Sequence, residues 1–362
     1  MSLSNELTDL LGIEHPIIQA PMGGESTPEM AVAVSNAGGL GGLGCSFMSL
    51  QEIDEKVEKI RSGTNGPFNL NFFAHPEPRI KNDVNAEILA RLENFYIELG
   101  ITEVPAGGEA TCDTFTEERL GLMLDLRPKT VSFHFGLPPV EMTRKLKDAG
   151  IIIMCSATTV AEAIWLDKSG VDVIIAQGWE AGGHRGTFDV SYEDFGVGTM
   201  ALVPQIVDAV DRPVIASGGI ADGRGVAAAL MLGAKGVQLG TAFLSCAEAN
   251  ITSDYREALK NAHDDETRLT RAFSGRPARA KNNRYIEMMA QQRSRLPDFP
   301  LMYNFSDPLE KACAEGFGTG FDFVLYGQAA SLNREMPAAD LVKLLVEETM
   351  DTLGVDFVRV EK

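Results

Sequence analysis

The segment VDVIIAQGWEAGGHRG (Val171–Gly186) joins an almost uninterrupted apolar run to a glycine-rich loop that carries a histidine. The apolar run, Val171–Ala176, has the length of a β-strand and is rich in Val and Ile, which is typical of a parallel strand covered on both faces. Gly182 and Gly183 stand directly before His184 in the loop that follows. The segment therefore predicts a strand whose carboxyl end leads into a candidate functional loop.

Seven other apolar segments have the same character, and amphipathic stretches separate them along the chain. The eight predicted strands are Pro16–Met22, Gly39–Gly44, Phe68–Phe73, Thr130–Gly136, Ile151–Ala157, Val171–Gly178, Pro213–Gly219 and Gly236–Phe243. Helix starts between them are signalled by capping residues, namely Thr27 with Pro28, Ser49 with Glu52, Thr159 with Glu162, and Asp222. Eight β-then-α units in series favour an α/β fold of the (β/α)8 TIM barrel type over an open sheet.

Two segments interrupt this alternation and are too long to be simple connections. Residues 76–129 contain a predicted helix over about 83–99 and a Gly/Thr-rich loop, and residues 263–335 contain a helical stretch over about 282–293 and a proline-punctuated loop. The predicted domains are a TIM barrel over 1–262 with the insertion 76–129 contributing to a cap, a smaller, mainly helical capping and substrate unit over 263–335, and a C-terminal helical segment over 336–362 that packs back on the barrel.

The composition is that of a globular protein and argues against some classes of partner. The chain has 362 residues, of which 44% are hydrophobic and 23% are charged, as is ordinary for a folded domain. Its net charge of -19, without a Lys/Arg block, argues against nucleic-acid binding, which needs a basic face. The five cysteines form no CxxC pair, which favours a reducing compartment.

The sequence offers no signal for export, membrane insertion or metal binding. The N-terminal stretch Met1–Asp9 is polar and lacks the apolar region of a signal peptide, and no apolar run reaches the length of a membrane span. No spacing of His, Cys and carboxylate residues suggests a metal site. We therefore expect a cytoplasmic protein without a membrane partner, either a monomer or a homodimer.

The loop with His184 lies at the carboxyl end of a predicted strand, which is the active face of a TIM barrel. A histidine there can exchange protons near neutral pH. The alternative is an ordinary glycine-rich turn whose histidine is merely solvated. The position of the loop, its paired glycines and the neighbouring Gln177 favour the functional interpretation.

Two glycine turns end the last two predicted strands. They comprise Ser217, Gly218 and Gly219 in the first turn, and Gln238, Leu239, Gly240 and Thr241 in the second. In phosphate-binding barrels the loops after strands seven and eight form the phosphate site, because exposed backbone N–H groups suit an oxyanion. The alternative is two ordinary turns, but their joint position favours a phosphate site, which FMN, a sugar phosphate or a nucleotide would fit.

Three other strand ends carry candidate site residues. The run Ala20-Pro21-Met22-Gly23 ends the first strand, and its small residues and proline would leave room for a flat ring. Asn71 stands near the end of the third strand, where its amide can donate to and accept from a heterocycle. His134 in the fourth strand borders the pocket if its side chain points inward, and is otherwise a core histidine.

Taken together, these residues resemble the nitronate monooxygenase family, formerly called 2-nitropropane dioxygenases, and especially its class I branch. The resemblance covers nearly the whole chain and is carried by Ala20–Gly24, Ser26–Gly41, Asn71–His75, Gln177–Gly186 and the two phosphate turns. Related NADH:quinone reductases and flavin enoyl-ACP reductases share the Glu-Ala-Gly-Gly-His core, so the combination is more specific to the superfamily than to one branch.

The resemblance implies FMN as the cofactor and an oxidation of alkyl nitronates by O2 through a flavin semiquinone, without a metal. It places His184 on the catalytic base of the family. The candidate cofactor-binding residues are Ala20, Pro21, Met22, Gly23, Asn71, Gln177, Gly182, Gly183, Ser217, Gly218, Gly219, Gln238, Leu239, Gly240 and Thr241. His134 and Tyr303 are the candidate residues of the substrate pocket.

One segment departs from the class I pattern. In class I enzymes a late segment of the capping unit brings tyrosines and a lysine to the pocket, and Phe299–Asp307 corresponds to it here. Tyr303 is retained, but Phe299 and Asp307 stand where a Tyr and a Lys are expected. Recognition of an anion is therefore expected to differ.

The expected function is FMN-dependent oxidation of a nitronate or nitroalkane by O2, with His184 as base or anion stabiliser. The main alternative is an FMN-dependent reductase that uses NAD(P)H on a quinone or an enoyl thioester. Two other classes rank lower. One is a sugar-phosphate isomerase or lyase without flavin, and the other is a flavin storage protein without activity.

Overall fold

The computed structural model describes residues 3–103, 107–108, 112–189, 196–290 and 295–354. The loop predicted around Gly107–Thr116 and the end of the helix predicted over 282–293 fall partly outside these residues. Within them, no helix is both long and apolar enough to cross a bilayer.

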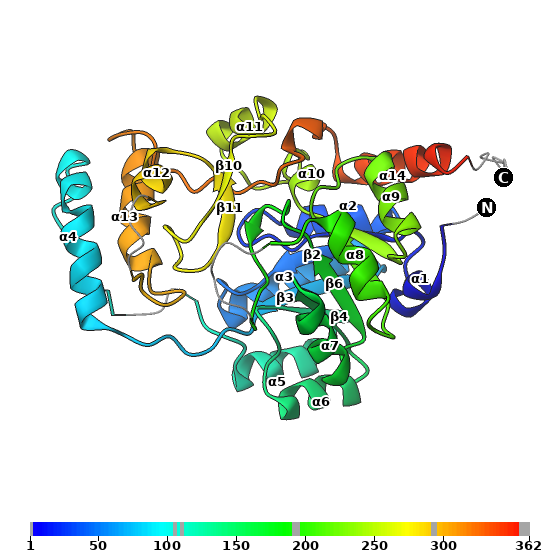
Figure 1. Ribbon diagram of the computed structural model, residues 1–362. Coiled ribbons are helices and arrows are strands. Elements are labelled where there is room, and N and C mark those ends of the chain that lie inside the picture. The colour runs from blue at the N-terminus through cyan, green and yellow to red at the C-terminus, as the bar shows by residue number, and fades with distance from the viewer. Residues whose placement is uncertain (1–2, 104–106, 109–111, 190–195, 291–294, 355–362) are drawn as a thin grey trace.

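Eight parallel strands form the barrel at the centre of the molecule (Figure 1). Their bounds are β1 Ile17–Gln19, β2 Gly41–Gly44, β3 Phe68–Phe73, β4 Thr130–His134, β5 Ile152–Ala157, β6 Val173–Gln177, β8 Val214–Ser217 and β9 Gly236–Leu239. A parallel bridge between Ile18 and Leu40 joins the two edges of the sheet. There the N–H of Leu40 donates to the carbonyl of Ile17 (2.9 Å), and the N–H of Gln19 donates to that of Leu40 (3.0 Å). The predicted (β/α)8 barrel is therefore confirmed.

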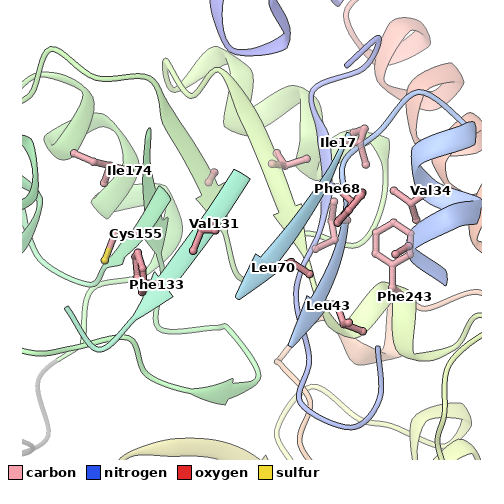
Figure 2. Close-up of a cluster of buried hydrophobic side chains, with 14 of the residues drawn as sticks. Ile17, Val34, Leu43, Phe68, Leu70, Val131, Phe133, Cys155, Ile174 and Phe243 are labelled. Atoms are coloured by element: carbon pink, nitrogen blue, oxygen red, sulfur yellow. The ribbon is translucent and has the colours of Figure 1, made fainter. Parts of the chain in front are cut away.

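Apolar residues alternate along the strands between two separate cores. On β5, Ile153 and Cys155 face the surrounding helices, whereas Ile152 and Met154 face the barrel interior. Figure 2 shows Cys155 with Val131 and other strand residues in the outer core. Because successive side chains of a strand point to opposite faces, a continuous apolar run fills both cores at once. Each fully buried Ile or Leu stabilises the fold by about 1.5–3 kcal/mol.

Helices cover the outside of the barrel and the end at which the strands begin. Those that follow the strands are α2 Pro28–Asn36, α3 Leu50–Gly63, α5 Glu117–Leu126, α6 Val140–Asp148, α7 Val160–Lys168, α8 Thr199–Val207, α9 Gly223–Met231 and the short α10 Thr241–Leu244. Helix α1 (Glu6–Leu11), which precedes the first strand, closes the end of the barrel at which the strands begin. There Leu7 and Leu11 pack into the interior core.

The capping signals are confirmed at four helices, with one correction. Thr27, Ser49 and Asp222 accept hydrogen bonds from the first-turn N–H groups of α2, α3 and α9. At α7, Thr159 accepts from the N–H of Glu162, but the reciprocal half of the predicted capping box is wrong. The carboxylate of Glu162 instead accepts from Thr158, directly before the N-cap, and from Thr187 and Phe188 further along the chain.

In the barrel, one helix and the ends of several strands differ from the sequence prediction. The predicted strand Gly236–Phe243 ends at Leu239, because the backbone turns helical at Gly240 and starts α10. Helix α5 was not predicted at all. It begins after Thr116, whose side chain caps it, and packs against α3 and α6 in the ring around the barrel.

A second unit lies beside the open end of the barrel (Figure 1). Its elements are α4 Asn82–Glu98, α11 Ser253–Lys260, β10 Thr267–Thr270, β11 Ala278–Lys281, α12 Arg284–Ala290, α13 Tyr303–Ala314 and the 3-10 turn Ala330–Leu332. Helices α4 and α13 pack against each other around a core that includes Ile88, Phe305 and Tyr285. The unit thus contains an antiparallel hairpin besides its helices. Its residues come from both long insertions and, in α11, from the segment just before the second one.

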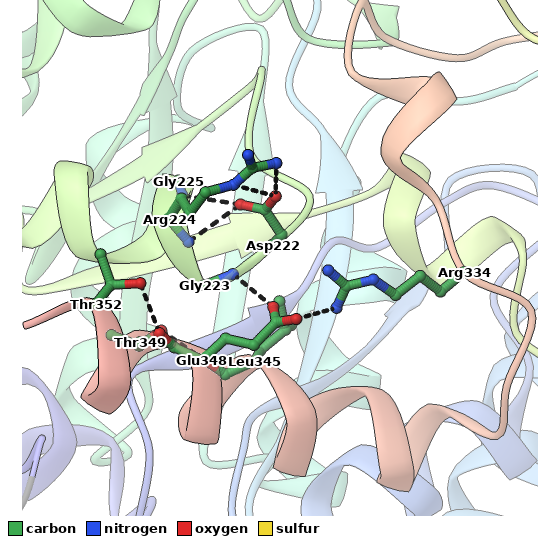
Figure 3. Close-up of polar contacts among 9 residues, drawn as sticks. All are labelled: Asp222, Gly223, Arg224, Gly225, Arg334, Leu345, Glu348, Thr349 and Thr352. Atoms are coloured by element: carbon green, nitrogen blue, oxygen red, sulfur yellow. Dashed lines mark hydrogen bonds and ion pairs between the residues drawn. The ribbon is translucent and has the colours of Figure 1, made fainter. Parts of the chain in front are cut away.

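The last helix, α14 (Ala338–Thr352), lies along α9 and also contacts α2 (Figure 1). Figure 3 shows the polar side of this contact, where the carboxylate of Glu348 accepts from the N–H of Gly223 (3.0 Å) and pairs with Arg334 (2.7 Å). A Cβ added to Gly223 would lie 2.2 Å from the Cβ of Glu348, so the two helices approach this closely only because residue 223 is glycine.

Candidate active site

A cavity of about 580 Å³ opens at the carboxyl ends of the barrel strands, between the barrel and the cap. All of the site residues predicted from the sequence line it, namely Ala20, Pro21, Met22, Gly23, Asn71, His134, Gln177, Gly182, Gly183, His184, Ser217, Gly218, Gly219, Gln238, Leu239, Gly240, Thr241 and Tyr303. The fold thus gathers residues from most of the strands at one place. What each of them binds remains a prediction.

Polar side chains line the barrel interior near the carboxyl ends of the strands, whereas apolar side chains fill the interior near the amino ends. The Nδ2 of Asn71 donates to the hydroxyl of Ser132 (2.9 Å) on the neighbouring strand β4. His134 follows two residues after Ser132, so both side chains point inward. The Nδ1 of His134 lies 2.9 Å from the hydroxyl of Ser156 at the end of β5. This polar layer forms the floor of the cavity.

The backbone of His184 is held from two sides. Its carbonyl accepts hydrogen bonds from the Nε2 of Gln177 (2.9 Å) and from the Nε2 of His134 (3.0 Å). The Oε1 of Gln177 also accepts from the N–H of Gly186 (2.7 Å). Gln177 and His134 therefore hold the loop around His184 by hydrogen bonds. The sequence predicted a ligand contact for each residue, but not this structural role.

The cap holds the same loop by strand pairing. Gly183 and His184 form a short strand, β7, that pairs antiparallel with β11, opposite Arg279 and Ala278. This pairing belongs to a small three-stranded sheet in the order β10-β11-β7. A loop that the sequence predicted as part of the barrel is thus shared between barrel and cap, and His184 lies at their junction.

The imidazole of His184 contacts a serine that the sequence analysis missed. Its Nε2 lies 2.9 Å from the hydroxyl of Ser274, 90 residues further along the chain. That hydroxyl is also within hydrogen-bond distance of the carbonyl (3.0 Å) and the N–H (3.2 Å) of Arg276. Behind the imidazole, the ring of Phe299 packs edge-on at 5.6 Å. No sequence motif around Ser274 marks this contact.

The two histidines of the site are neutral near pH 7. Burial, the nearby His134 and the charge of Arg276 lower the pKa of His184 to about 3. Burial also lowers the pKa of His134 to about 4, although its bond to the His184 carbonyl works in the opposite direction. Arg276 is itself buried, with its guanidinium 4.0 Å from the ring centre of Phe135. A neutral imidazole has a nitrogen available to accept a proton.

The two predicted phosphate turns both line the cavity. The first is distinguished by its backbone conformation and the second by a buried side-chain oxygen without a partner. Gly218 and Gly219 have φ values of +103° and +73°, and a Cβ on Gly218 would lie 2.9 Å from the N of Ala181. Only glycine lets the turn pass this close to the His184 loop. In the second turn, Gln238 is 8% exposed, and its Oε1 has no partner among the described residues. A buried acceptor without a partner is costly and indicates a ligand.

Glu162 anchors the chain just beyond His184. This fully buried carboxylate accepts from the N–H (2.6 Å) and hydroxyl (2.8 Å) of Thr158, from the hydroxyl of Thr187 (2.9 Å) and from the N–H of Phe188 (2.7 Å). These bonds tie the loop after His184 to the start of α7. They explain why Glu162 does not complete the capping box with Thr159.

Helix α13 presents an acidic face to the cavity. Tyr303, Asp307 and Glu310 line it from successive turns of the helix, and Glu25 lines it from the loop after β1. Phe299 lies behind His184 instead, in contact with Tyr303. Of these acids only Asp307 is marked by the sequence pattern, whereas Glu310 and Glu25 were not predicted. The i, i+4, i+7 spacing from Tyr303 nevertheless places Glu310 on the same helix face.

Among the described residues, no group of three His, Cys, Asp or Glu side chains could hold a metal ion.

Comparison with known proteins identifies the family of the chain. The profile of the family described as "Nitronate monooxygenase" matches residues 4–348. A nitronate monooxygenase of Pseudomonas aeruginosa is 42% identical over 349 residues, which cover 96% of this chain and 99% of that protein.

Two solved structures extend the similarity to the fold. A nitroalkane oxidase from Streptomyces ansochromogenes has a TM-score of 0.88 and 36% identity, covering 97% of this chain and 99% of that one. FabK from Thermotoga maritima has a TM-score of 0.75 and 28% identity, covering 97% of both chains. Because the family profile and a relative of this identity each span nearly the whole chain, this protein belongs to the nitronate monooxygenase family.

Proposed function

We propose that this protein is an FMN-dependent oxidoreductase that oxidises alkyl nitronates with O2, and that His184 is its acid–base group. The observation that carries the proposal is the neutral imidazole of His184 in the cavity, held by Gln177, His134 and Ser274. The membership of the nitronate monooxygenase family supports the substrate class.

The residues of the cavity fit FMN. The turns at 217–219 and 238–241 would hold its phosphate through backbone N–H groups, and the Oε1 of Gln238 offers an acceptor without a partner to a ring N–H. Asn71, Met22 and Ala20 would border the ring. FMN, when bound, supplies the electron acceptor, whereas the protein supplies position and electrostatics.

Ser274 allows His184 to work in either tautomer. When the serine hydroxyl donates to the carbonyl of Arg276, it accepts from the Nε2–H of His184, and the Nδ1 lone pair is left to take the α-proton of a neutral nitroalkane. When the hydroxyl donates to Nε2 instead, Nδ1 carries a hydrogen that can bond a nitronate oxygen. An imidazole with a pKa of about 3 is a weak base, so we expect nitronates to react faster than the parent nitroalkanes.

Oxygen uptake by the purified protein with bound FMN tests the proposal. Nitrobutane as its nitronate, neutral nitrobutane and NADH are compared at equal concentration. The proposal expects O2 consumption in the order nitronate, nitroalkane, NADH. It is wrong if the nitronate consumes no O2 and leaves the absorbance of the FMN unchanged under anaerobic mixing.

The second candidate is an FMN-dependent reductase that uses NAD(P)H on a quinone or an enoyl thioester. It is favoured by the structural similarity to FabK from Thermotoga maritima. The carboxyl groups of Glu25, Asp307 and Glu310 on the cavity wall disfavour the phosphates of a pyridine nucleotide. Rapid bleaching of the FMN by NADH, faster than by any nitronate, would select this candidate instead.

A further inference from the structure

The acidic wall of the cavity, defined as Glu25, Asp307 and Glu310, is assembled from two distant segments. Asp307 and Glu310 lie one turn apart on α13, and Glu25 lies in the loop between β1 and α2. All three line the same cavity as His184. Tyr303 connects the two regions, because its ring is 6.4 Å from Phe323, which is in turn 6.2 Å from the imidazole of His184.

Within the described part of the chain, the acidic wall lacks a balancing cation. Among the described residues that line the cavity, none is Lys or Arg. None of the three carboxylates forms an ion pair with another described residue. Burial of the carboxyl groups, together with the charge of Glu310, raises the pKa of Glu25 and of Asp307 to about 7. The carboxyl groups therefore repel one another, and a cation placed beside them would be stabilised.

The cavity is built to take a ligand, independently of this wall. The orphaned Oε1 of Gln238 lies in the same lining, on a side chain only 8% exposed. Arg276 does not line the cavity, but its positive charge acts on His184 and lowers the pKa of the imidazole. The electrostatic environment therefore differs between the His184 side, near Arg276, and the acidic α13 side.

We propose that the acidic wall sets the substrate class, so that the enzyme prefers nitronates that carry a protonated amine at the other end of the molecule and disfavours those that carry a carboxylate. This inference rests on the proposed function. The ammonium group would lie among Glu25, Asp307 and Glu310, and the nitronate at His184. A carboxylate in the same position would meet three like charges and no Lys or Arg among the described lining residues.

A matched set of three nitronates tests the proposal at pH 8, where the acidic wall is ionised. They are those of 3-nitropropan-1-amine, 1-nitrobutane and 3-nitropropanoate, which have similar lengths and a positive, a neutral and a negative end. The expected kcat/KM falls by about tenfold from the amine to the neutral compound and again to the carboxylate. Equal values, or a preference for the carboxylate, would overturn the proposal.

Variants connect the preference to the wall. Asp307→Asn and Glu310→Gln are each expected to reduce the preference for the amine over 1-nitrobutane, measured as the ratio of the two kcat/KM values, to about threefold or less. Glu315→Gln, an exposed acid just after α13 and outside the cavity lining, is the control and should keep the full preference. A preference that survives in all three variants would assign it to something other than the acidic wall.

Binding of unreactive analogues separates this proposal from the proposed function. Calorimetry with butan-1-amine and butanoate measures the charge preference without any turnover. If no nitronate is oxidised but the amine binds about tenfold more tightly than butanoate, the proposed function is wrong while the acidic wall recognises cations as inferred. If nitronates are oxidised but butanoate binds as tightly as the amine, the inference about the wall is wrong and the proposed function stands.

Discussion

His184 combines a fixed backbone with an imidazole that stays neutral. Two side chains, Gln177 and His134, hold its carbonyl, and Ser274 holds its Nε2. Its low pKa follows mainly from burial, with smaller contributions from His134 and Arg276. The residue is therefore suited to proton transfer and to donating a hydrogen bond, and less suited to carrying a permanent positive charge.

Replacing His184 by Asn separates these two roles. The amide can still bond a nitronate oxygen, but it cannot take a proton from carbon. We expect His184→Asn to lower kcat/KM for neutral nitroalkanes by about 10²–10⁴-fold and that for nitronates by less than about tenfold. Oxygen uptake with each nitroalkane and its nitronate measures both values. Equal losses for the two forms would contradict a role as base.

Asp307 should destabilise the folded protein at alkaline pH. Its folded pKa of about 7 lies above its ordinary value of 3.8, so the folded state binds more protons between these values. Stability is then lost as the pH rises through this window. We expect Asp307→Asn to raise the free energy of unfolding at pH 8 by about 1 kcal/mol, since the carboxyl group is partly screened in the open cavity, and to change it little at pH 4.

Urea denaturation at both pH values checks this expectation, and Asp83→Asn is its control. A hydrogen bond from Arg295 lowers the pKa of Asp83, which lies on the surface of α4. Its contribution to stability is present above its ordinary pKa and is lost as the pH falls, so Asp83→Asn should be destabilising at pH 8. Changes of the same sign in both variants would refute the assignment for Asp307.

At the scale of elements, the loop that carries His184 is held at both ends. Strand β7 pairs with β11 of the cap, and the residues just beyond it bond the carboxylate of Glu162 at the start of α7. Glu162 is fully buried, and its carboxylate accepts from the N–H and hydroxyl groups of buried Thr158, from the hydroxyl of buried Thr187 and from the N–H of Phe188. The position of His184 therefore depends on a helix that supplies no residue to its imidazole.

Glu162→Ala should leave several buried donors without a partner. At about 1–3 kcal/mol for each unsatisfied group, and with some relaxation of the loop, we expect a loss of about 3 kcal/mol in the free energy of unfolding. Urea denaturation monitored by circular dichroism measures the loss. Glu141→Ala, at an exposed glutamate in the first turn of α6, should cost less than about 0.5 kcal/mol. Similar losses in both variants would show that the Glu162 bonds contribute little.

At the scale of the whole molecule, α14 joins the end of the chain to the barrel. Leu345 and Val342 are fully buried in the outer core, and Glu348 ties the same helix to the start of α9 (Figure 3). The contact spans more than a hundred residues, as Gly223 and Glu348 are 125 apart. The barrel wall at α9 and α2 therefore depends on this helix for its cover.

Leu345→Ala should destabilise the whole fold and not only the end of the chain. Removal of a fully buried Leu side chain costs about 2–5 kcal/mol, depending on how far the site collapses. Lys343→Ala, two residues earlier on the exposed face of α14, should cost less than about 0.5 kcal/mol. A single unfolding transition shifted in Leu345→Ala is the expected result. A separate early transition would instead mean that α14 unfolds independently of the barrel.

Local patterns predicted most of the barrel. Short apolar runs predicted all eight strands of the barrel, because parallel strands covered on both faces need continuous apolar sequence. For β3 the predicted bounds, Phe68–Phe73, are the observed ones. Helix α5 was missed because its start lies just after a loop that dominates the local pattern. The end of β9 was predicted too late because the following α10 is apolar as well.

What the sequence by itself determined is the barrel, the glycine turns at its carboxyl end and the position of His184 among them, because each depends on neighbours a few residues apart. Only the tertiary structure placed Ser274 beside His184, used Glu162 to hold the loop rather than to cap α7, and brought Glu25 to the same cavity as Asp307 and Glu310. These contacts depend on how the cap packs on the barrel. Such packing joins residues far apart in sequence through complementary surfaces, which no local spacing records.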